Sequence, residues 1–370
     1  MSRSDTAKYH ALDAYRFLAA MGVVLLHYSV DFKIVADGRW PFVEGMRAMV
    51  DFFFLLSGFV IAVSYRDRMA SPSDYGVYLK ARFARIYPLH LATFAIVALA
   101  ALAAARVGLD IGYPKNFGAD GVIPTLLLTQ AWGMLDHDTF NAPAWSLSAE
   151  FFVYLLTPLA FWLARRLSTR VMIALAIALY LALELARAQA GLRPLSAATW
   201  DFGVMRALAP FLVGVALGFA APRLRAWASG RGAPFARWSL AHLVGALILV
   251  GLCVGLPMAA LVALFAAMVA LAAACEGAGL KSRLSATPMR ALGDMSFAIY
   301  LLHPVVYKAV SIPARRLGLI DGGAGSLAAA LATTALVLAA AWVCYRWFEA
   351  PARRRINALA LRRHAAVPAE

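Results

Sequence analysis

The sequence predicts an all-α, polytopic membrane protein with about ten transmembrane helices and both termini in the cytoplasm. Two observations lead to this fold class. First, 62% of the 370 residues are hydrophobic and 15% are charged, with a mean hydropathy of +0.71, whereas soluble domains are about 45–50% apolar and about 25% charged. Second, the apolar residues occur in runs of about 20, the length that a helix needs to cross a bilayer.

The apolar runs define the spans and the domain organisation. We predict spans at 11–30, 44–65, 83–106, 143–164, 171–187, 203–220, 239–255, 258–275, 293–311 and 326–348. Residues 1–10 are then an N-terminal tail, 11–348 form one membrane domain, and 349–370 form a basic C-terminal tail. The first span carries ionisable residues, unlike the apolar region of a cleaved signal peptide, so we expect it to be retained.

The basic residues are distributed unevenly between alternate loops. With the N-terminus in the cytoplasm, most of the 35 Lys and Arg residues fall on the cytoplasmic side. This asymmetry follows the positive-inside rule and predicts a multi-pass protein of the bacterial inner membrane. Membrane lipids are the expected contacts of the arginines in the C-terminal tail. The net charge of +15 is explained by these anchors, so nucleic acid is not an expected partner.

Two further features bear on what the chain binds. The three cysteines lie inside apolar runs without metal-ligand spacing, so no metal is expected. The connection 107–142 is long and contains an apolar piece, 122–132, that is too short to cross a bilayer. This segment is either re-entrant or a lid on the membrane surface.

Ionisable residues inside spans are costly and are candidates for function. The first span contains Asp13, Arg16 and His27. Arg16 and His27 are eleven residues apart, which places them on one helix face about 16 Å apart along the axis. Such a face suits an elongated anionic ligand, held by the guanidinium at one end and reaching a base or nucleophile at the other. Alternatively, Arg16 reaches the headgroups and His27 caps the helix.

The next two spans carry smaller clusters. Ser57 and Gly58 favour close packing between helices, and Asp51 is placed to pair with Arg47 one turn earlier. Arg82 and Arg85 lie one turn apart at the start of the third span. Paired arginines suit phosphate recognition, although on the charge count alone simple positive-inside anchoring is the better explanation.

The fourth and ninth spans carry the remaining candidates. Pro143 favours a helix start, followed by Trp145, Ser146 and, about two turns into the membrane, Glu150. Trp145 is typical of the membrane interface. Glu150 requires a partner there, either an arginine or an imidazole that it orients. The ninth span contains Tyr300 and His303, and a lone helical histidine is more often structural than catalytic.

These clusters, in this order, resemble the acyltransferase 3 family of bacterial membrane proteins. The resemblance covers nearly the whole chain, from Leu12 to Arg353. It is carried by Leu12-Asp13 with Arg16 and His27, Asp51-Phe52-Phe53-Phe54 with Leu56-Ser57-Gly58-Phe59, Arg82 and Arg85 before Ile86-Tyr87-Pro88, Trp145-Ser146-Leu147 with Glu150, and Tyr300-Leu301-Leu302-His303.

The resemblance implies a ten-helix domain with both ends in the cytoplasm. It also implies transfer of an acyl group, often acetyl, from acyl-coenzyme A to a hydroxyl of an extracytoplasmic glycan or another hydroxylated acceptor. His27 matches the family's essential histidine, Arg16 its paired basic residue, and Arg82 and Arg85 the arginine pair that is tied to the donor. No esterase-like domain follows the last span, so we expect direct acylation or the help of a separate extracytoplasmic transferase.

These expectations combine into a mechanism. Arg82, Arg85 and Arg16 bind the coenzyme A phosphates through charge-assisted hydrogen bonds. His27 acts as a general base on the acceptor hydroxyl or carries the acyl group transiently, and both routes stay open. Glu150 orients the imidazole or pairs with an arginine. The expected substrate contacts are Ser57, Trp145, Ser146, Tyr300 and His303.

Two other function classes fit the buried charges. A transporter or flippase would move an acyl donor, a lipid or a glycan without chemistry. A sensor or assembly partner of an envelope complex would tolerate loss of His27. Acyl-coenzyme A turnover by the purified protein distinguishes an enzyme from both.

Overall fold

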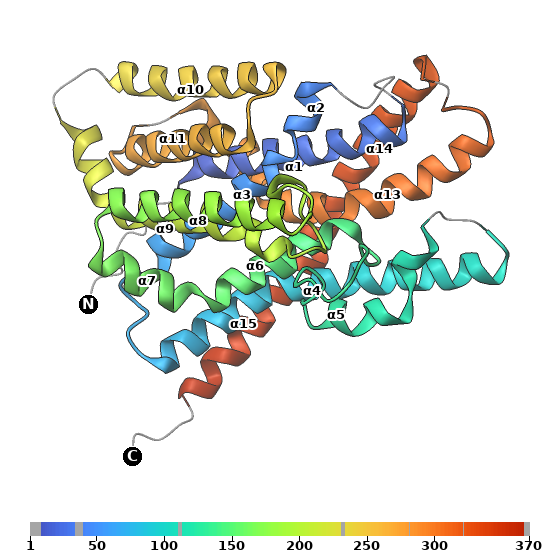
Figure 1. Cartoon of the computed structure of the whole chain (residues 1–370), viewed down its shortest axis with the longest axis horizontal. Helices are drawn as coiled ribbons and strands as arrows, with labels where there is room; N and C mark the ends of the chain where they lie inside the picture. Colours follow the sequence, from blue (N-terminus) through green and yellow to red (C-terminus); the bar gives the residue numbers. More distant parts are fainter. Residues whose placement is uncertain are drawn as a thin grey trace. The chain divides into compact units, whose positions relative to one another are not determined.

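The computed structural model describes residues 9–33, 40–109, 113–230, 234–280, 282–320 and 322–365. Figure 1 shows that this part of the chain is built of helices, and no strand occurs among the described residues. The predicted all-α class is therefore confirmed. The chain divides into two compact units, each with segments from distant parts of the sequence.

The first unit comprises Met1–Asp67, Leu159–Ala197 and Met205–Ser296. Its helices are α1 (His10–Asp31), α2 (Pro41–Gly45), α3 (Ala48–Tyr65), most of α7 (Thr157–Arg166), α8 (Thr169–Gln189), most of α9 (Gly203–Ser229), α10 (Pro234–Val254), α11 (Met258–Gly277) and α12 (Thr287–Asp294). Within this unit α10 and α11 lie side by side (Figure 1). Helix α1 contacts α3, α11 and α12.

The second unit comprises Arg68–Pro158, Ala198–Val204 and Phe297–Glu370. Its helices are α4 (Pro72–Arg106), α5 (Val122–Leu126), α6 (Trp145–Leu155), most of α13 (Ser296–Arg316), α14 (Ala324–Cys344) and α15 (Ala350–Ala365). A π-helical turn, Tyr345–Glu349, joins α14 to α15. Helix α4 contacts α6, the π-helical turn and α15.

Eight helices in the described residues are long and apolar enough to cross a membrane, or up to nine if a bent pair of helices is counted as one span. The multi-pass helical architecture is thus confirmed, while the number ten and the cytoplasmic position of both ends stay predictions. Helix α1, which carries Asp13 and Arg16 within its first two turns, is not among these eight. Helix α5 has five residues, as expected for a piece too short to cross.

Several helix boundaries differ from the prediction, and prolines and caps explain them. Helix α4 begins at Pro72, eleven residues before the predicted start, because Ser71 and Asp74 form a capping box there. The predicted fourth span is interrupted at Leu156, between α6 and α7. Pro158 lacks an N–H and its ring would collide with the carbonyl four residues earlier, which favours a break at this point.

Close packing of α3 against α9 organises the first unit. A Cβ atom added at Gly58 would collide with the backbone oxygen of Phe211, and one added at Gly214 would collide with that of Leu55. The absence of a Cβ at Gly58 therefore permits this close helix packing, as the sequence indicated.

The predicted pairing of Asp51 with Arg47 is wrong. Asp51 is 3% exposed and forms a two-pronged ion pair with Arg206 of α9, whose Nη2 and Nε atoms lie 2.6 and 3.1 Å from the carboxylate oxygens. Arg47 instead pairs with Glu44 at 2.7 Å, and its backbone oxygen accepts from Arg206. A charge inside the helix packing needs a buried partner, which the exposed Arg47 side chain does not provide.

Candidate functional site

Helix α1 carries the imidazole expected to do chemistry. Nδ1 of His27 lies 2.9 Å from the backbone oxygen of Val23, one turn earlier. A carbonyl oxygen only accepts, so Nδ1 carries the proton, and in the neutral ring the lone pair is on Nε2. Nε2 is therefore the atom of His27 that can accept a proton or attack a carbonyl carbon.

The same helix holds Arg16 in fixed register with His27. Helix α1 runs from His10 to Asp31 without interruption, which supports the predicted shared face and the spacing of about 16 Å along the axis. Both side chains are half-buried. A guanidinium and an imidazole at this separation suit a ligand that is long and anionic at one end.

The start of α1 is held by residues that are distant in the sequence. Both carboxylate oxygens of Glu276, at the end of α11, lie 3.0 Å from the backbone N–H of Ala11. Glu276 also accepts from the hydroxyl of Ser285. A carboxylate at a helix N-terminus satisfies the unpaired N–H groups and the positive end of the helix dipole. Gly293 of α12 packs directly against the backbone of Asp13.

In the second unit, helix α4 presents the two arginines. Nη1 of Arg85 lies 2.5 Å from Oε1 of Glu349, and the guanidinium carbon lies 5.1 Å from the ring centre of Phe297. The side chains of Arg85 and Glu349 are 14% and 3% exposed. Arg85 is thus held in a buried ion pair, which does not fit a simple anchor reaching toward headgroups. Arg82 is half-buried one turn earlier.

A polar cluster joins the start of α6 to α13. The Ser146 hydroxyl lies 2.9 Å from the backbone oxygen of Pro143 and 2.7 Å from the Tyr300 hydroxyl. Asn141 donates to the backbone oxygen of Leu301 at 3.0 Å. His303 is fully buried, with Nδ1 lying 2.7 Å from the backbone oxygen of Tyr300. The structure therefore brings three predicted substrate contacts, Ser146, Tyr300 and His303, into one cluster.

Two neighbours on α6 complete this region. Trp145 is 8% exposed and packs its ring against Gly203. Its role as a substrate contact stays a prediction. Glu150 accepts a hydrogen bond from the Tyr154 phenol at 2.5 Å. The Tyr154 ring meets Tyr78 of α4 edge-to-face, with ring centres 6.3 Å apart. The pairing of Glu150 with an arginine or an imidazole stays a prediction.

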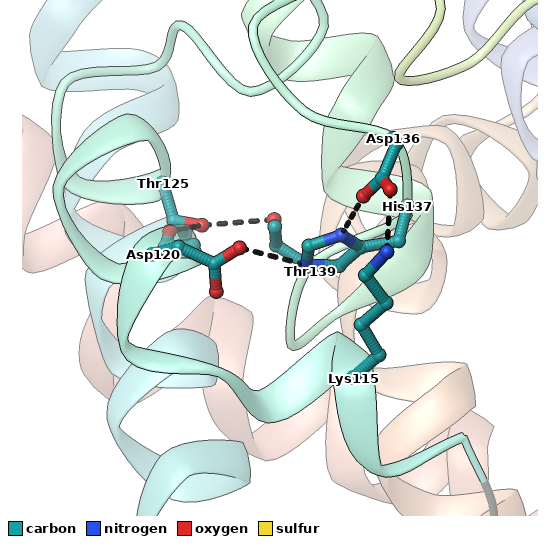
Figure 2. A network of polar contacts seen from close by, with 7 residues as sticks. Lys115, Asp120, Thr125, Asp136, His137 and Thr139 are labelled. Carbon is teal, nitrogen blue, oxygen red and sulfur yellow. Dashed lines mark hydrogen bonds and ion pairs between the residues drawn. The ribbon is translucent and has the colours of Figure 1, made fainter.

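Residues in the segment between α4 and α6 form a network of polar contacts with one another (Figure 2). His137 is 7% exposed, with Nδ1 2.8 Å from Asp136 and Nε2 3.7 Å from Asp120. Asp136 also pairs with Lys115. Its hydrogen bonds to His137 and Lys115 lower the Asp136 pKa to about 2. Whether this segment is a lid or re-entrant stays open.

A comparison with known protein families identifies the family. Residues 9–346 match the acyltransferase domain that defines the acyltransferase 3 family. The chain belongs to this family.

Two curated proteins share shorter stretches with this acyltransferase 3 member. Acyltransferase MdmB of Streptomyces mycarofaciens is 43% identical over 125 residues, which cover 33% of this chain and 30% of MdmB. Protein 2 in the picA locus of Rhizobium radiobacter is 38% identical over 99 residues, which cover 26% of this chain and 48% of that protein. The chain thus spans less than half the length of both relatives. No solved structure matches it.

The predicted site residues of this family member divide between the two units. Arg16, His27 and Ser57 belong to the first unit, and the remaining residues belong to the second. Those in the second are Arg82, Arg85, Trp145, Ser146, Glu150, Tyr300 and His303. The structure describes the local setting of each group, and a joint site that includes His27 and the α4 arginines stays a prediction.

Sequence reasoning missed two acidic residues that hold predicted site elements. Glu276 binds the start of α1 and Glu349 binds Arg85. Both carboxylates lie at the end of an apolar run, and this position is the available signal. Glu349 has Arg346 and Arg353 within about one turn, so its sequence context does not indicate Arg85 as the partner. Among the described residues, no three His, Cys, Asp or Glu side chains are placed to hold a metal ion.

Proposed function

We propose that this protein is a membrane-bound acyltransferase that moves an acyl group, acetyl in the first instance, from acyl-coenzyme A to a hydroxyl. The acceptor is an extracytoplasmic glycan or another hydroxylated molecule. Membership of the acyltransferase 3 family supports this activity, as does the similarity to a relative named as an acyltransferase. Its place is the bacterial inner membrane, with both ends in the cytoplasm.

The observation that carries the proposal is the Nδ1–H hydrogen bond of His27 to Val23. With the lone pair on Nε2, the imidazole accepts the proton of the acceptor hydroxyl as its oxygen attacks the thioester carbon. The C–S bond then breaks, and the coenzyme A thiolate takes a proton back from the imidazolium. In the alternative route, Nε2 itself attacks the thioester and the acyl group passes from the ring to the hydroxyl. Both routes end in an ester and free coenzyme A.

The arginines supply the donor side of the proposal. Coenzyme A carries phosphates, and guanidinium groups bind phosphates through short, charge-assisted hydrogen bonds. Arg82 and Arg85 lie one turn apart on α4, and Arg16 lies on the α1 face of His27. The cluster of Ser146, Tyr300 and His303 is the proposed place of further substrate contacts, together with Trp145, Glu150 and Ser57.

Binding of the donor tests this proposal. Purified protein in detergent is titrated with acetyl-coenzyme A, and its thermal stability is followed because a ligand that binds the native state raises the melting temperature. Wild type should be stabilised, and Arg16→Ala should lose that stabilisation. Arg68→Ala, which removes an exposed arginine before α4, is the matched control and should respond as wild type does. An absence of stabilisation in wild type would contradict the donor assignment and point to a different acyl donor or to a transporter of another molecule.

A further inference from the structure

The last membrane helix contains a π-helical turn at a defined place. The π-helical turn Tyr345–Glu349 lies between α14 and α15, and the backbone N–H of Ala350 reaches the oxygen of Tyr345. Pro351 follows directly, and it has neither an N–H to give to the carbonyl four residues earlier nor room for its ring there. Single π-helical turns inside helices are uncommon and are often found at functional sites.

Within the turn, two aromatic residues are exposed and one acidic residue is buried. Trp347 and Phe348 are 63% and 41% exposed, whereas Glu349 is 3% exposed. The turn thereby delivers a carboxylate to the interior of the second unit, where α4 lies against the turn and α15. Burial of a charge in this way is unfavourable unless it is paired.

The partner of this acid is one of the two arginines on α4. Oε1 of Glu349 lies 2.5 Å from Nη1 of Arg85, and the Arg85 guanidinium lies over the ring of Phe297 at 5.1 Å. A carboxylate at one edge and an aromatic ring at one face restrict both the position and the rotation of a planar guanidinium. A guanidinium has five N–H donors, so the contact through Nη1 leaves it able to bind an anion as well.

Charge balance gives a second reason for this arrangement. Arg82 and Arg85 are three residues apart on one helix, where like charges repel. The negative charge of Glu349 compensates one of the two positive charges. It thereby lowers the cost of keeping both guanidinium groups largely buried. A surface ion pair would not do this, because solvent already screens such charges.

We propose that Glu349 is a positioning residue that fixes the Arg85 guanidinium for binding the phosphates of acyl-coenzyme A. Glu349 itself does not touch the reacting atoms. This inference rests on the proposed function, in which Arg82 and Arg85 bind the donor. It adds that the π-helical turn at the end of the last membrane helix takes part in donor recognition.

Glu349→Gln tests the inference, since the amide keeps the shape and removes the charge. The dissociation constant of acetyl-coenzyme A should rise about tenfold, as expected for loss of a charged hydrogen bond. Binding of S-acetylpantetheine, which lacks the coenzyme A phosphates, should not change. Glu44→Gln is the matched control, because it breaks an exposed pair with Arg47, and it should bind both ligands as wild type does.

A double-mutant cycle with Arg85→Gln establishes whether Glu349 acts through Arg85. If it does, adding Glu349→Gln to Arg85→Gln should change acetyl-coenzyme A affinity no further. Independent, additive losses would overturn the inference. Equal weakening of acetyl-coenzyme A and S-acetylpantetheine would also overturn it, because it would indicate a general structural role.

The proposed function and this inference fail in different ways. If wild type does not bind acetyl-coenzyme A, the proposed function is wrong. If wild type binds it and folded Glu349→Gln binds it equally well, the inference alone is wrong. Should Glu349→Gln not accumulate in membranes, Glu349→Asp replaces it, since it keeps the charge and shortens the reach. A rise in the dissociation constant is then expected for acetyl-coenzyme A only, and unchanged affinity overturns the inference.

Discussion

Removing one partner of the ion pair between Asp51 and Arg206 should strongly destabilise the first unit. Asp51 and Arg206 side chains are 4% and 5% exposed, and the carboxylate accepts from both Nε and Nη2. Removing one partner of a buried pair leaves the other charge without compensation, which costs about 3–5 kcal/mol. Whole domains are stable by about 5–15 kcal/mol. Asp51→Ala should therefore lose a large share of the stability.

The exposed pair nearby provides the comparison. Arg47 and Glu44 are 46% and 43% exposed at 2.7 Å, and such pairs contribute about 0–1 kcal/mol. Thermal unfolding of purified protein in one detergent should show a large decrease in melting temperature for Asp51→Ala and almost none for Glu44→Ala. The double variant Asp51→Leu with Arg206→Met should recover much of the loss, because it leaves no buried charge. Equal melting temperatures for Asp51→Ala and Glu44→Ala would refute this reasoning.

Three further perturbations probe the helix packing, α1 and the segment between α4 and α6. Gly214→Ala should destabilise the protein by about 1–3 kcal/mol, as overpacking does, and lower its melting temperature, since its Cβ would meet the backbone oxygen of Leu55. Gly245→Ala, where a Cβ meets nothing within 4 Å, should leave the melting temperature unchanged. Glu276→Ala should cost about 1 kcal/mol, as loss of a helix cap does, and an unchanged melting temperature would contradict its capping of α1. Asp136, whose pKa is lowered to about 2, should keep its lysine and histidine contacts in mild acid. The folded-state pKa of Asp136 lies below that of an ordinary aspartate. The stability that these contacts contribute is therefore fully present above the ordinary aspartate pKa and is lost as the pH falls toward about 2. Pepsin cleavage within 113–142 should therefore increase only near that pH, and an increase already near pH 4 would contradict the assignment.

The parts of the fold that depend on local periodicity could be predicted from the sequence. The face shared by Arg16 and His27 follows from the helical repeat, and α1 runs unbroken through both. The packing use of Gly58 follows from its size. Prolines set boundaries that simple hydropathy does not show, as at the interruption before Pro158.

Contacts between distant residues could not be predicted in this way. Asp51 was assigned the nearest basic residue along the helix, whereas its partner Arg206 lies 155 residues away. The acids that hold α1 and Arg85 lie 265 and 264 residues from the groups they bind. One sequence gives no information on which of many buried charges will meet, because tertiary packing decides it.

Turnover of acetyl-coenzyme A by His27→Ala tests the central claim most directly. His242→Ala is the matched control, because Nδ1 of His242 on α10 makes the same contact with the backbone four residues earlier, at 2.6 Å from Trp238. Membranes that contain equal amounts of each protein are supplied with radiolabelled acetyl-coenzyme A, and release of free thiol and transfer of label are measured. Wild type and His242→Ala should transfer acetyl groups, whereas His27→Ala should bind the donor and transfer none. Normal transfer by His27→Ala would contradict the account.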